Sequence, residues 1–337
     1  MPPRYRVPIR MSSEDHMQGA GTAGAAIVVI GSMNTDLVTY VHRAPGPGET
    51  VIGRRFQSGF GGKGANQAAM ARLLGADVTL VGALGDDAYA DLTLENFARL
   101  GIDAVGVMRV PGSSGVAPIW VDDDGTNRII VVAGANDRLT PDHAAAAVSA
   151  LGHVHVAVGQ FEVPQAATAA GFAAARAQGA VTILNPAPAA AISTELLAVT
   201  DWLIPNESEF AALAATAGGG DAAGEAGDAG DDALRAFAQD HQVRLIVTLG
   251  AHGAALVGAD GTVTRVPARA VAAIDTSGAG DAFVGAFAVG IALGWREIDA
   301  LALGLACASD SVTRAGTQAS FPDRAASATI LAGIARA

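Results

Sequence analysis

The chain has 337 residues, 50% of them hydrophobic, and carries a formal net charge of −12 at pH 7. Its length suits one large α/β domain or two average domains. The acidic balance argues against nucleic acid or an anionic membrane as a partner, because both require a basic surface. The single cysteine, Cys307, excludes an internal disulfide and predicts a reducing, cytoplasmic environment, with the cysteine itself a small buried core residue.

The beginning of the chain contains arginines but no continuous apolar run. We therefore expect residues 1–25 to be a disordered extension rather than a signal peptide. Farther along, no uninterrupted apolar run reaches about 18 residues, the length that a membrane-spanning helix needs. The longest candidate, residues 282–295, is shorter and contains glycines, which predicts a buried helix.

Short apolar runs alternate with Ala-rich stretches of helical length. The predicted strands are 26–31, 78–81, 154–158, 181–184, 202–205 and 245–249. The predicted helices are 63–74, 87–100, 141–150, 164–178, 207–215 and 233–241. Strands separated by helices of this length predict βαβ units, and hence an α/β fold with a mostly parallel sheet covered on both faces.

Four further strands are predicted without helices between them. Residues 115–121 and 126–132 are joined by Asp-Asp-Asp-Gly at 122–125, a strong hairpin signal. Residues 36–41 and 49–56 are the other pair, with a Pro- and Gly-rich connection. Together they predict a small separate sheet that forms a lid.

Two smaller features complete this part of the prediction. Pro118 would suit an edge strand or a bulge better than a central strand, because proline donates no hydrogen bond to its neighbour. Residues 218–232, rich in Gly, Ala and Asp, predict a flexible surface insertion.

The most informative stretch is residues 275–283, which read Asp-Thr-Ser-Gly-Ala-Gly-Asp-Ala-Phe. Small residues allow a tight turn, and the first N–H groups of the following helix have no partner inside it. Gly278, Ala279 and Gly280 are therefore placed to bind an anion, most plausibly a phosphate in transfer. Asp281 would lie beside it and accept a proton from an attacking hydroxyl. The alternative is a loop with an acidic helix cap.

Two motifs near the beginning carry further polar groups. Residues 31–36 lack the glycine spacing of a dinucleotide-binding loop. Asn34 and Asp36 share a face of an extended chain and could bind vicinal hydroxyls, or simply form a turn. In residues 59–67, Lys63 precedes glycine, which excludes a Walker A loop. It is the only lysine among 21 basic residues, which indicates a need for a compact ammonium group.

These motifs, in this order, resemble those of the ribokinase-like family of carbohydrate kinases. The resemblance extends from about residue 26 to residue 325. The motifs that carry it are 31–36, 59–67, Asn-Glu-Ser-Glu at 206–209 and 275–283, with Gln-Phe-Glu at 160–162 and Leu-Asn-Pro-Ala-Pro at 184–188. It implies a three-layer α/β/α domain over residues 26–330 with a mostly parallel central sheet and a small β lid through which two copies form a homodimer.

The resemblance also implies a role for each matching position. Asp281 matches the base, and Gly278, Ala279 and Gly280 match the anion hole. The sugar-binding positions are Asn34, Asp36, Gly62, Lys63, Gly64, Ala65, Asn66, Glu162 and Asp281. The positions for ATP and Mg²⁺ are Asn206, Glu209, Thr248, Leu249, Gly250, Ala251, His252, Gly253, Gly280 and Asp281. The positions for K⁺ are Asp275, Ser277, Ser311, Arg314, Gly316 and Ser320.

Two residues depart from the family pattern. Leu305 stands where a polar residue often lies near the adenine, so one base contact is missing. Asp310 falls in a stretch that is usually apolar, so it either faces solvent or lies where the helix is irregular. Both leave the nucleotide preference less certain than the transfer chemistry.

The expected activity is therefore ATP-dependent phosphorylation of ribose to ribose 5-phosphate, with Mg²⁺ required and K⁺ activating. Deoxyribose, fructose and nucleosides remain alternative substrates. A sugar-sensing protein without turnover is the alternative of another class. The intact Asp281 and its anion-binding loop argue against that alternative.

Overall fold

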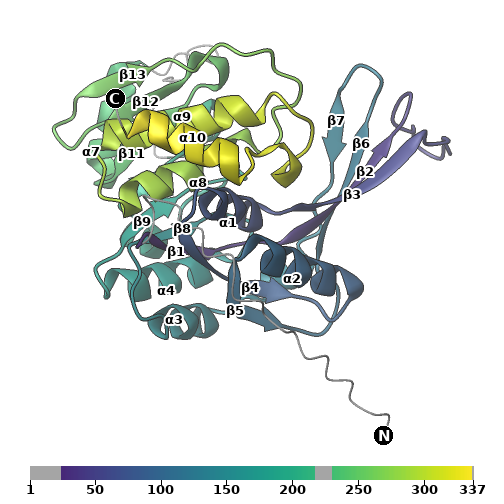
Figure 1. Cartoon of the computed structure of the whole chain (residues 1–337), viewed down its shortest axis with the longest axis horizontal. Helices are drawn as coiled ribbons and strands as arrows, with labels where there is room; N and C mark the ends of the chain where they lie inside the picture. Colours follow the sequence, from purple (N-terminus) through teal and green to yellow (C-terminus); the bar gives the residue numbers. More distant parts are fainter. Residues whose placement is uncertain (1–23, 217–229, 336–337) are drawn as a thin grey trace, which may run out of the picture.

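The computed structural model describes residues 24–216 and 230–335. In this part of the chain a nine-stranded sheet is covered on both faces by helices, and a four-stranded sheet projects from one side (Figure 1). The order of the large sheet is β13 (Val263–Val266), β12 (Ala254–Val257), β11 (Arg244–Thr248), β10 (Trp202–Leu203), β9 (Val181–Leu184), β8 (Val156–Gly159), β1 (Ala26–Ile30), β4 (Asp77–Leu84) and β5 (Asp103–Arg109). The pairs from β11 to β5 are parallel, and β12 and β13 are antiparallel. The predicted fold class is confirmed.

Alternate side chains of each central strand enter different cores. On β1, Ile27 and Val29 belong to one buried cluster and Val28 and Ile30 to the other. The first cluster is covered by α1 (Lys63–Leu73), α2 (Ala88–Leu100), α8 (Ala279–Ala292), α9 (Glu297–Ser311) and α10 (Arg324–Ile334). The second is covered by α3 (Pro141–Ser149), α4 (Gln165–Arg176), α5 (Thr194–Leu197), α6 (Glu207–Thr216) and α7 (Asp231–His241). Cys307 of α9 is fully buried, as predicted, and burial raises the pKa of its thiol to about 12.

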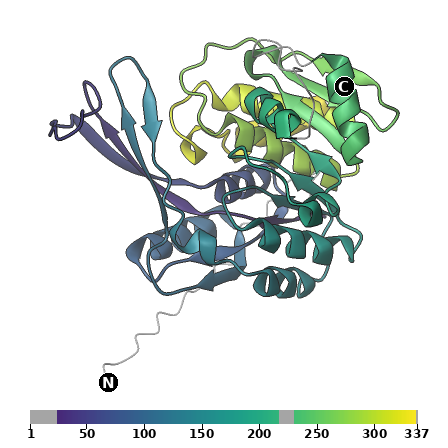
Figure 2. The ribbon, with the colours of Figure 1, turned by 180° about the vertical axis from the view of Figure 1, so that it is seen from behind.

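The projecting sheet is the predicted lid. Its order is β3 (Arg55–Gly61), β2 (Asn34–Tyr40), β6 (Gly115–Val121) and β7 (Asn127–Ile129). Figures 1 and 2 show it extending away from the helices. The hairpin turn is confirmed, because Asp122 N–H donates to Thr126 O at 2.9 Å.

The lid differs from the prediction in two places. The strand expected at 49–56 begins only at Arg55 and continues to Gly61, because the glycines pair with β2. Pro118 lies on β6, which is an interior strand between β2 and β7. It accepts from Ile130 N–H at 3.0 Å but has no N–H to return, so the β6–β7 ladder is interrupted there.

Other differences concern short or terminal segments. Strands β5, β12 and β13 and helices α5 and α10 were not predicted. Strands β12 and β13 and helix α5 have only four residues each, too few to show a clear period. The predicted disordered extension lies mostly outside the described residues. Ala25, which was included in it, is buried, and its carbonyl accepts a hydrogen bond from Asp77 N–H. Most of the proposed insertion also lies outside the described residues, and Asp231 already begins α7. None of the described helices is long and apolar enough to cross a membrane.

Candidate active site

The site lies where the carboxyl ends of the parallel strands meet the first turns of two helices, α1 and α8. Ligands of open α/β sheets bind at this edge. A cavity of about 210 Å³ is found there. Its lining residues are Lys63, Asn185, Ala187, Ile204, Asn206, Glu209, Thr248, Thr276, Gly278, Gly280, Asp281 and Val284.

The first turn of α8 forms one wall of this cavity. Gly278 has φ 76°, a left-handed conformation that glycine adopts readily, and a Cβ there would lie 3.3 Å from the Cα of Thr317. Among the described residues, none accepts a hydrogen bond from the N–H groups of Gly280 and Asp281. Those N–H groups, together with the helix dipole, make this turn suitable for an anion.

Asp281 is only 7% exposed, and both of its oxygens are held by side-chain amides. Asn66 Nδ2 donates to Oδ2 at 2.9 Å, and Gln67 Nε2 donates to Oδ1 at 3.0 Å. Each oxygen keeps a free lone pair, so the carboxylate can still accept a proton from a hydroxyl in the cavity. Gln67 was missed by the sequence reasoning, although it follows Asn66 in the same motif.

Lys63 is the first residue of α1 and lines the same cavity. Burial lowers the pKa of its ammonium group, but the negative charges of Asp281, Glu162 and Glu209 more than offset this and hold the pKa above its usual value. Lys63 is therefore a permanently charged group among three carboxylates. The three nearby carboxylates favour a positively charged side chain at this position.

Glu162 connects two of the sequence motifs. Its Oε2 accepts from the Ser32 hydroxyl at 2.5 Å and from the N–H of Lys63 at 2.9 Å. Nearby, Asn34 Oδ1 accepts from Asn136 Nδ2 at 2.8 Å. Asn136 comes from the short helical turn η1 (Gly134–Arg138), and no sequence pattern identified it.

Asp36 lies on β2 at the base of the lid and is 8% exposed. The pKa of Asp36 is raised to about 6, mainly because the carboxyl group is buried. The hydrogen bond with the Thr317 hydroxyl opposes this rise, and the charges of Glu162 and Asp281 add to it. Thr317 Oγ1 also donates to Phe60 O at 3.0 Å. Asp36, which belongs to the lid, is therefore linked through Thr317 to the body of the domain.

Asn206 and Glu209 form a capping box at the beginning of α6. Glu209 Oε2 accepts from the N–H of Asn206, and Asn206 Oδ1 accepts from the N–H of Glu209, both at 2.8 Å. Burial raises the pKa of Glu209, and its bond from Asn206 and the charge of Lys63 oppose that rise without cancelling it. Thr248, at the end of β11, pairs with Asn206 and lines the cavity.

The expected potassium positions come from three segments: Asp275 and Ser277 precede α8, Ser311 ends α9, and Arg314, Gly316 and Ser320 lie in the turn after α9. Asp275 Oδ1 accepts from Ser277 N–H at 2.9 Å and Oδ2 from Gly316 N–H at 2.8 Å. Burial raises the pKa of Asp275, but these two bonds bring it below its usual value. Among the described residues, no lysine or arginine side chain pairs with Asp275.

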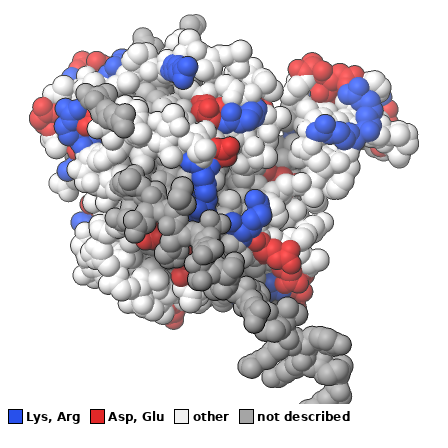
Figure 3. Space-filling view, viewed as in Figure 1, with Lys and Arg blue, Asp and Glu red and all other residues white. Residues whose placement is uncertain are grey.

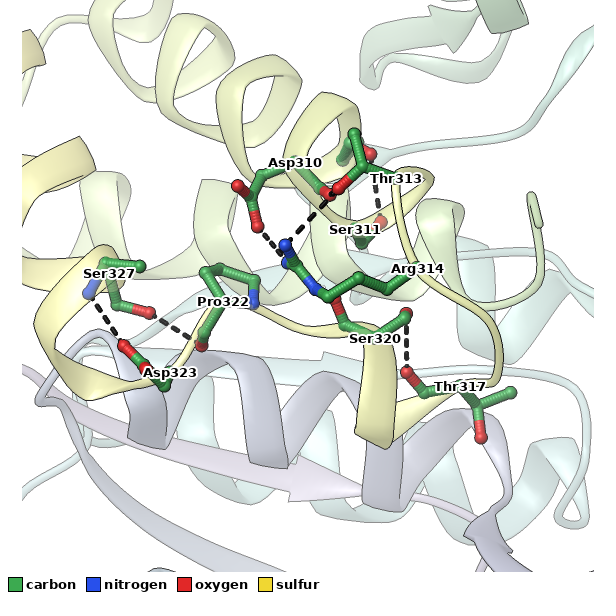
Figure 4. Close-up of polar contacts among 11 residues, drawn as sticks. Asp310, Ser311, Thr313, Arg314, Thr317, Ser320, Pro322, Asp323 and Ser327 are labelled. Carbon is green, nitrogen blue, oxygen red and sulfur yellow. Dashed lines mark hydrogen bonds and ion pairs between the residues drawn. The ribbon is translucent and has the colours of Figure 1, made fainter. Parts of the chain in front are cut away.

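Arg314 organises the rest of this turn (Figure 4). Its Nε donates to Ser320 O at 2.9 Å, and its Nη2 contacts Asp310 Oδ2. Asp310 lies on a continuous α9, half-buried in this ion pair, so the helix is not irregular there. Ser311 is buried on the same helix, and its hydroxyl donates to Ala308 O at 2.9 Å.

Some predicted positions lie away from the cavity of α1 and α8. Ala65 is a core residue, and Gly64 allows the close approach of α1 to Ser32, because a Cβ at Gly64 would lie 2.5 Å from the N of Ser32. Of the positions expected to bind the nucleotide at 248–253, Thr248, at the end of β11, lines the cavity and the others do not. Leu305 lines a second cavity, of about 370 Å³, between α9, α10 and the segment after β13.

Comparisons with known proteins identify the family. Residues 25–324 match the pfkB family carbohydrate kinase model. The ribokinase of Lactococcus lactis is 35% identical over 298 residues, 88% of this chain and 93% of that protein. The deoxyribokinase of Salmonella typhi is 37% identical over 301 residues, 88% and 95% of the two chains. The structure of Arabidopsis thaliana ribokinase complexed with ribose and ATP has a TM-score of 0.80 and 31% identity and covers 90% and 98%. The chain therefore belongs to the pfkB family of carbohydrate kinases and is a sugar kinase phosphotransferase.

Proposed function

We propose that this protein transfers the γ-phosphoryl group of ATP to D-ribose and forms D-ribose 5-phosphate. One observation carries the proposal: a single cavity brings together Lys63, the unpaired N–H groups of α8 and the buried carboxylate of Asp281. These are the parts that phosphoryl transfer needs, namely a base, a cation and anion-binding N–H groups. Relatives named ribokinase, and the complex with ribose and ATP, support ribose as the acceptor.

In this mechanism Asp281 accepts the proton of the attacking hydroxyl as the new O–P bond forms, and the bond between the γ-phosphorus and the β–γ bridging oxygen breaks, so that ADP leaves. The N–H groups of the first turn of α8 donate to the oxygens of the transferred group and stabilise their negative charge. Lys63, which lines the same cavity, adds positive charge there. Asn34, Asp36 and Glu162 bind the sugar hydroxyls and hold the acceptor in line, because polar side chains fixed by their neighbours orient a substrate well.

Magnesium would be held near Asn206 and Glu209. Mg²⁺ usually keeps several waters and takes one or two protein carboxylates together with substrate phosphates. Glu209 fits this need, because it is a buried carboxylate that lines the cavity. When bound, the ion neutralises charge on the phosphates.

Potassium would be held by the Asp275 carboxylate and by backbone carbonyls of Ser277, Ser311, Arg314, Gly316 and Ser320. Asp275 fits, because it is an ionised group without a cationic side-chain partner among the described residues and is fixed to Gly316. A bound ion would stabilise the turn that packs against Gly278.

Potassium is therefore expected to raise kcat several-fold over sodium at fixed ionic strength. Asp275→Ala should weaken this response while the melting temperature changes by only a few degrees, about the effect of 1 kcal/mol or less in a chain of this size. Initial rates in matched Na⁺ and K⁺ buffers test it. Equal rates in the two salts would remove the ion from the mechanism.

The KM for ribose is expected to rise as the pH falls through about 6. The pKa of Asp36 is raised to about 6, and only the ionised carboxylate accepts hydrogen bonds from sugar hydroxyls at both of its oxygens. Because the folded-state pKa exceeds the unfolded one, protonation of Asp36 favours the folded state, so unfolding at this group does not explain the loss. Steady-state kinetics between pH 5 and 8 give the answer. Asp36→Asn should have a high KM without this pH dependence; a wild-type KM that is flat across pH 6 contradicts the assignment.

An ADP-release assay across ribose, deoxyribose, fructose, fructose 6-phosphate, adenosine and 2-keto-3-deoxygluconate tests the substrate. The proposal expects the highest kcat/KM for ribose. Deoxyribose is the second candidate, because the Salmonella typhi relative is named a deoxyribokinase. Binding of ribose without ADP release would instead indicate a sugar sensor.

We further propose that two copies associate through the lid. Its exposed apolar side chains include Phe56, 63% exposed, and Ile129, 52% exposed, and the segment 130–132 continues the apolar run. Charged residues gather at the tip of the lid (Figure 3), where ion pairs join Arg43 to Glu49 and Arg128 to Asp122. Apolar surface of this kind is typical of interfaces. A solution mass equal to one 33.6 kDa chain would contradict this association.

A further inference from the structure

We propose that Gln160 is a positioning residue that holds Asp281 in its productive orientation by acting through Gln67. The inference rests on the proposed function, in which Asp281 is the base. Gln160 follows β8, Gln67 lies on α1, and Asp281 lies on the first turn of α8. Both glutamines are fully buried, so neither side chain has surface left for a substrate.

The direction of the hydrogen bonds in this cluster is set by groups that can only accept. Asn185 Nδ2 donates to the carbonyl of Ile204 at 2.8 Å, so Asn185 Oδ1 faces Gln67. Gln67 must then present Nε2, which donates to Asn185 Oδ1 at 3.1 Å and to Asp281 Oδ1 at 3.0 Å. Its Oε1 consequently faces Gln160, whose Nε2 donates to it at 2.7 Å. A reversed Gln67 amide would place its oxygen against two other oxygens.

This arrangement leaves one buried atom unsatisfied. Gln160 Oε1 has no hydrogen-bond partner among the described residues and lies against Gly31, where a Cβ would be 2.2 Å from it. An unpaired buried acceptor costs about 1–3 kcal/mol. An apolar side chain of similar volume would avoid that cost. The amide at this position therefore contributes a donor, and the group that receives it is Gln67.

The consequence for catalysis is geometric. Asn66 holds Oδ2 of Asp281, and Gln67 holds Oδ1, so the plane of the carboxylate is fixed at both oxygens. Small errors in the orientation of a reacting group lower the rate strongly, because the reactive geometry is narrow. Without the donor of Gln160, Gln67 Oε1 is a buried acceptor with no partner, so the Gln67 amide is held on one side only and can shift away from the carboxylate.

The test is Gln160→Met, which keeps the volume and removes both the donor and the unpaired oxygen. We expect kcat to fall about tenfold, which corresponds to about 1.4 kcal/mol. The KM values for ribose and ATP should stay within about twofold, because no binding contact is removed. The melting temperature should change little, because the unpaired Gln160 Oε1 is removed while the buried Gln67 Oε1 loses its donor. A merely structural glutamine would give the opposite pattern, with lower stability and unchanged kcat.

A double-variant cycle gives a second readout. Gln67→Met should lower kcat further, and Gln67→Met with Gln160→Met should be no slower than Gln67→Met alone, because Gln160 acts only through Gln67. Gln178 offers a matched control. It also has a buried Oε1 without a partner among the described residues, and its Nε2 donates to Val148 O at 2.9 Å, away from the site. Gln178→Met should leave kcat unchanged.

Three outcomes would overturn the inference. They are a wild-type kcat in Gln160→Met, independent losses that multiply in the double variant, and an equal loss in Gln178→Met. If Gln67→Met does not fold, the comparison of Gln160→Met with Gln178→Met still decides. An active Asp281→Asn variant is a different result, because it refutes the proposed base rather than the role of Gln160.

Discussion

Replacing Asp281 by asparagine is expected to lower kcat by about 10²–10⁴-fold, the range for loss of general-base assistance. The physical reason is that an amide cannot take the proton of the sugar hydroxyl. Its effect on sugar affinity should be much smaller, because Asn34, Asp36 and Glu162 remain in place. Steady-state kinetics with ribose and ATP, together with direct ribose binding by calorimetry, measure the two effects separately.

A local side effect of this substitution needs a control. Asn66 and Gln67 both donate to the carboxylate, and an asparagine side chain has only one oxygen to accept these bonds. Asp281→Ala removes both contacts and should be similarly slow if proton transfer is the main loss. Asp299→Asn, a matched change on α9 outside both cavities, should keep its activity. An Asp281→Asn variant with more than about a tenth of wild-type kcat would contradict the assignment of the base.

The sequence predicted the parts of the site that lie next to one another in the chain. The small residues before Asp281 and the apolar run after it were sufficient to predict a tight turn at the beginning of a helix, because that geometry is local. The cavity then brings Lys63, Asn206, Glu209 and Asp281 together, as the motif order implied. These residues stand at the beginnings of helices, whose positions follow from the regular alternation of strands and helices.

The partners that hold the site were not predictable in the same way. Asn136, from η1, binds Asn34, and Thr317, from the turn after α9, binds Asp36. The two residues of each pair lie far apart in the sequence, and no periodic pattern connects them. Similarly, the predicted strand ended at residue 56, but Gly59 and Gly61 also belong to β3, because pairing with β2 decides the structure there.

The most specific expectation concerns Lys63, because it is the only lysine in the chain. Lys63→Arg keeps the charge, yet we expect a loss of at least about tenfold in kcat/KM, or about 1.4 kcal/mol. An arginine is longer, and its planar fork favours two-point binding to a carboxylate. Here it would face Asp281, Glu162 and Glu209, whose charges act on this position. A two-point pair with Asp281 would occupy the base.

The control for Lys63 also uses the fact that the chain has only one lysine. Acetylation is carried out at high pH, where part of the Lys63 side chain is the neutral amine that reacts, and in a chain with one lysine the amines it modifies are Lys63 and the N-terminus. It should inactivate the wild-type protein, ATP with ribose should protect against it, and the residual activity of Lys63→Arg should be insensitive to the reagent. If Lys63 is instead a surface residue kept by accident, Lys63→Arg will show near wild-type kcat/KM for ribose and ATP. That result would refute a role for the ammonium group in transfer, because the substitution preserves charge and changes only the shape and donor directions of the cation.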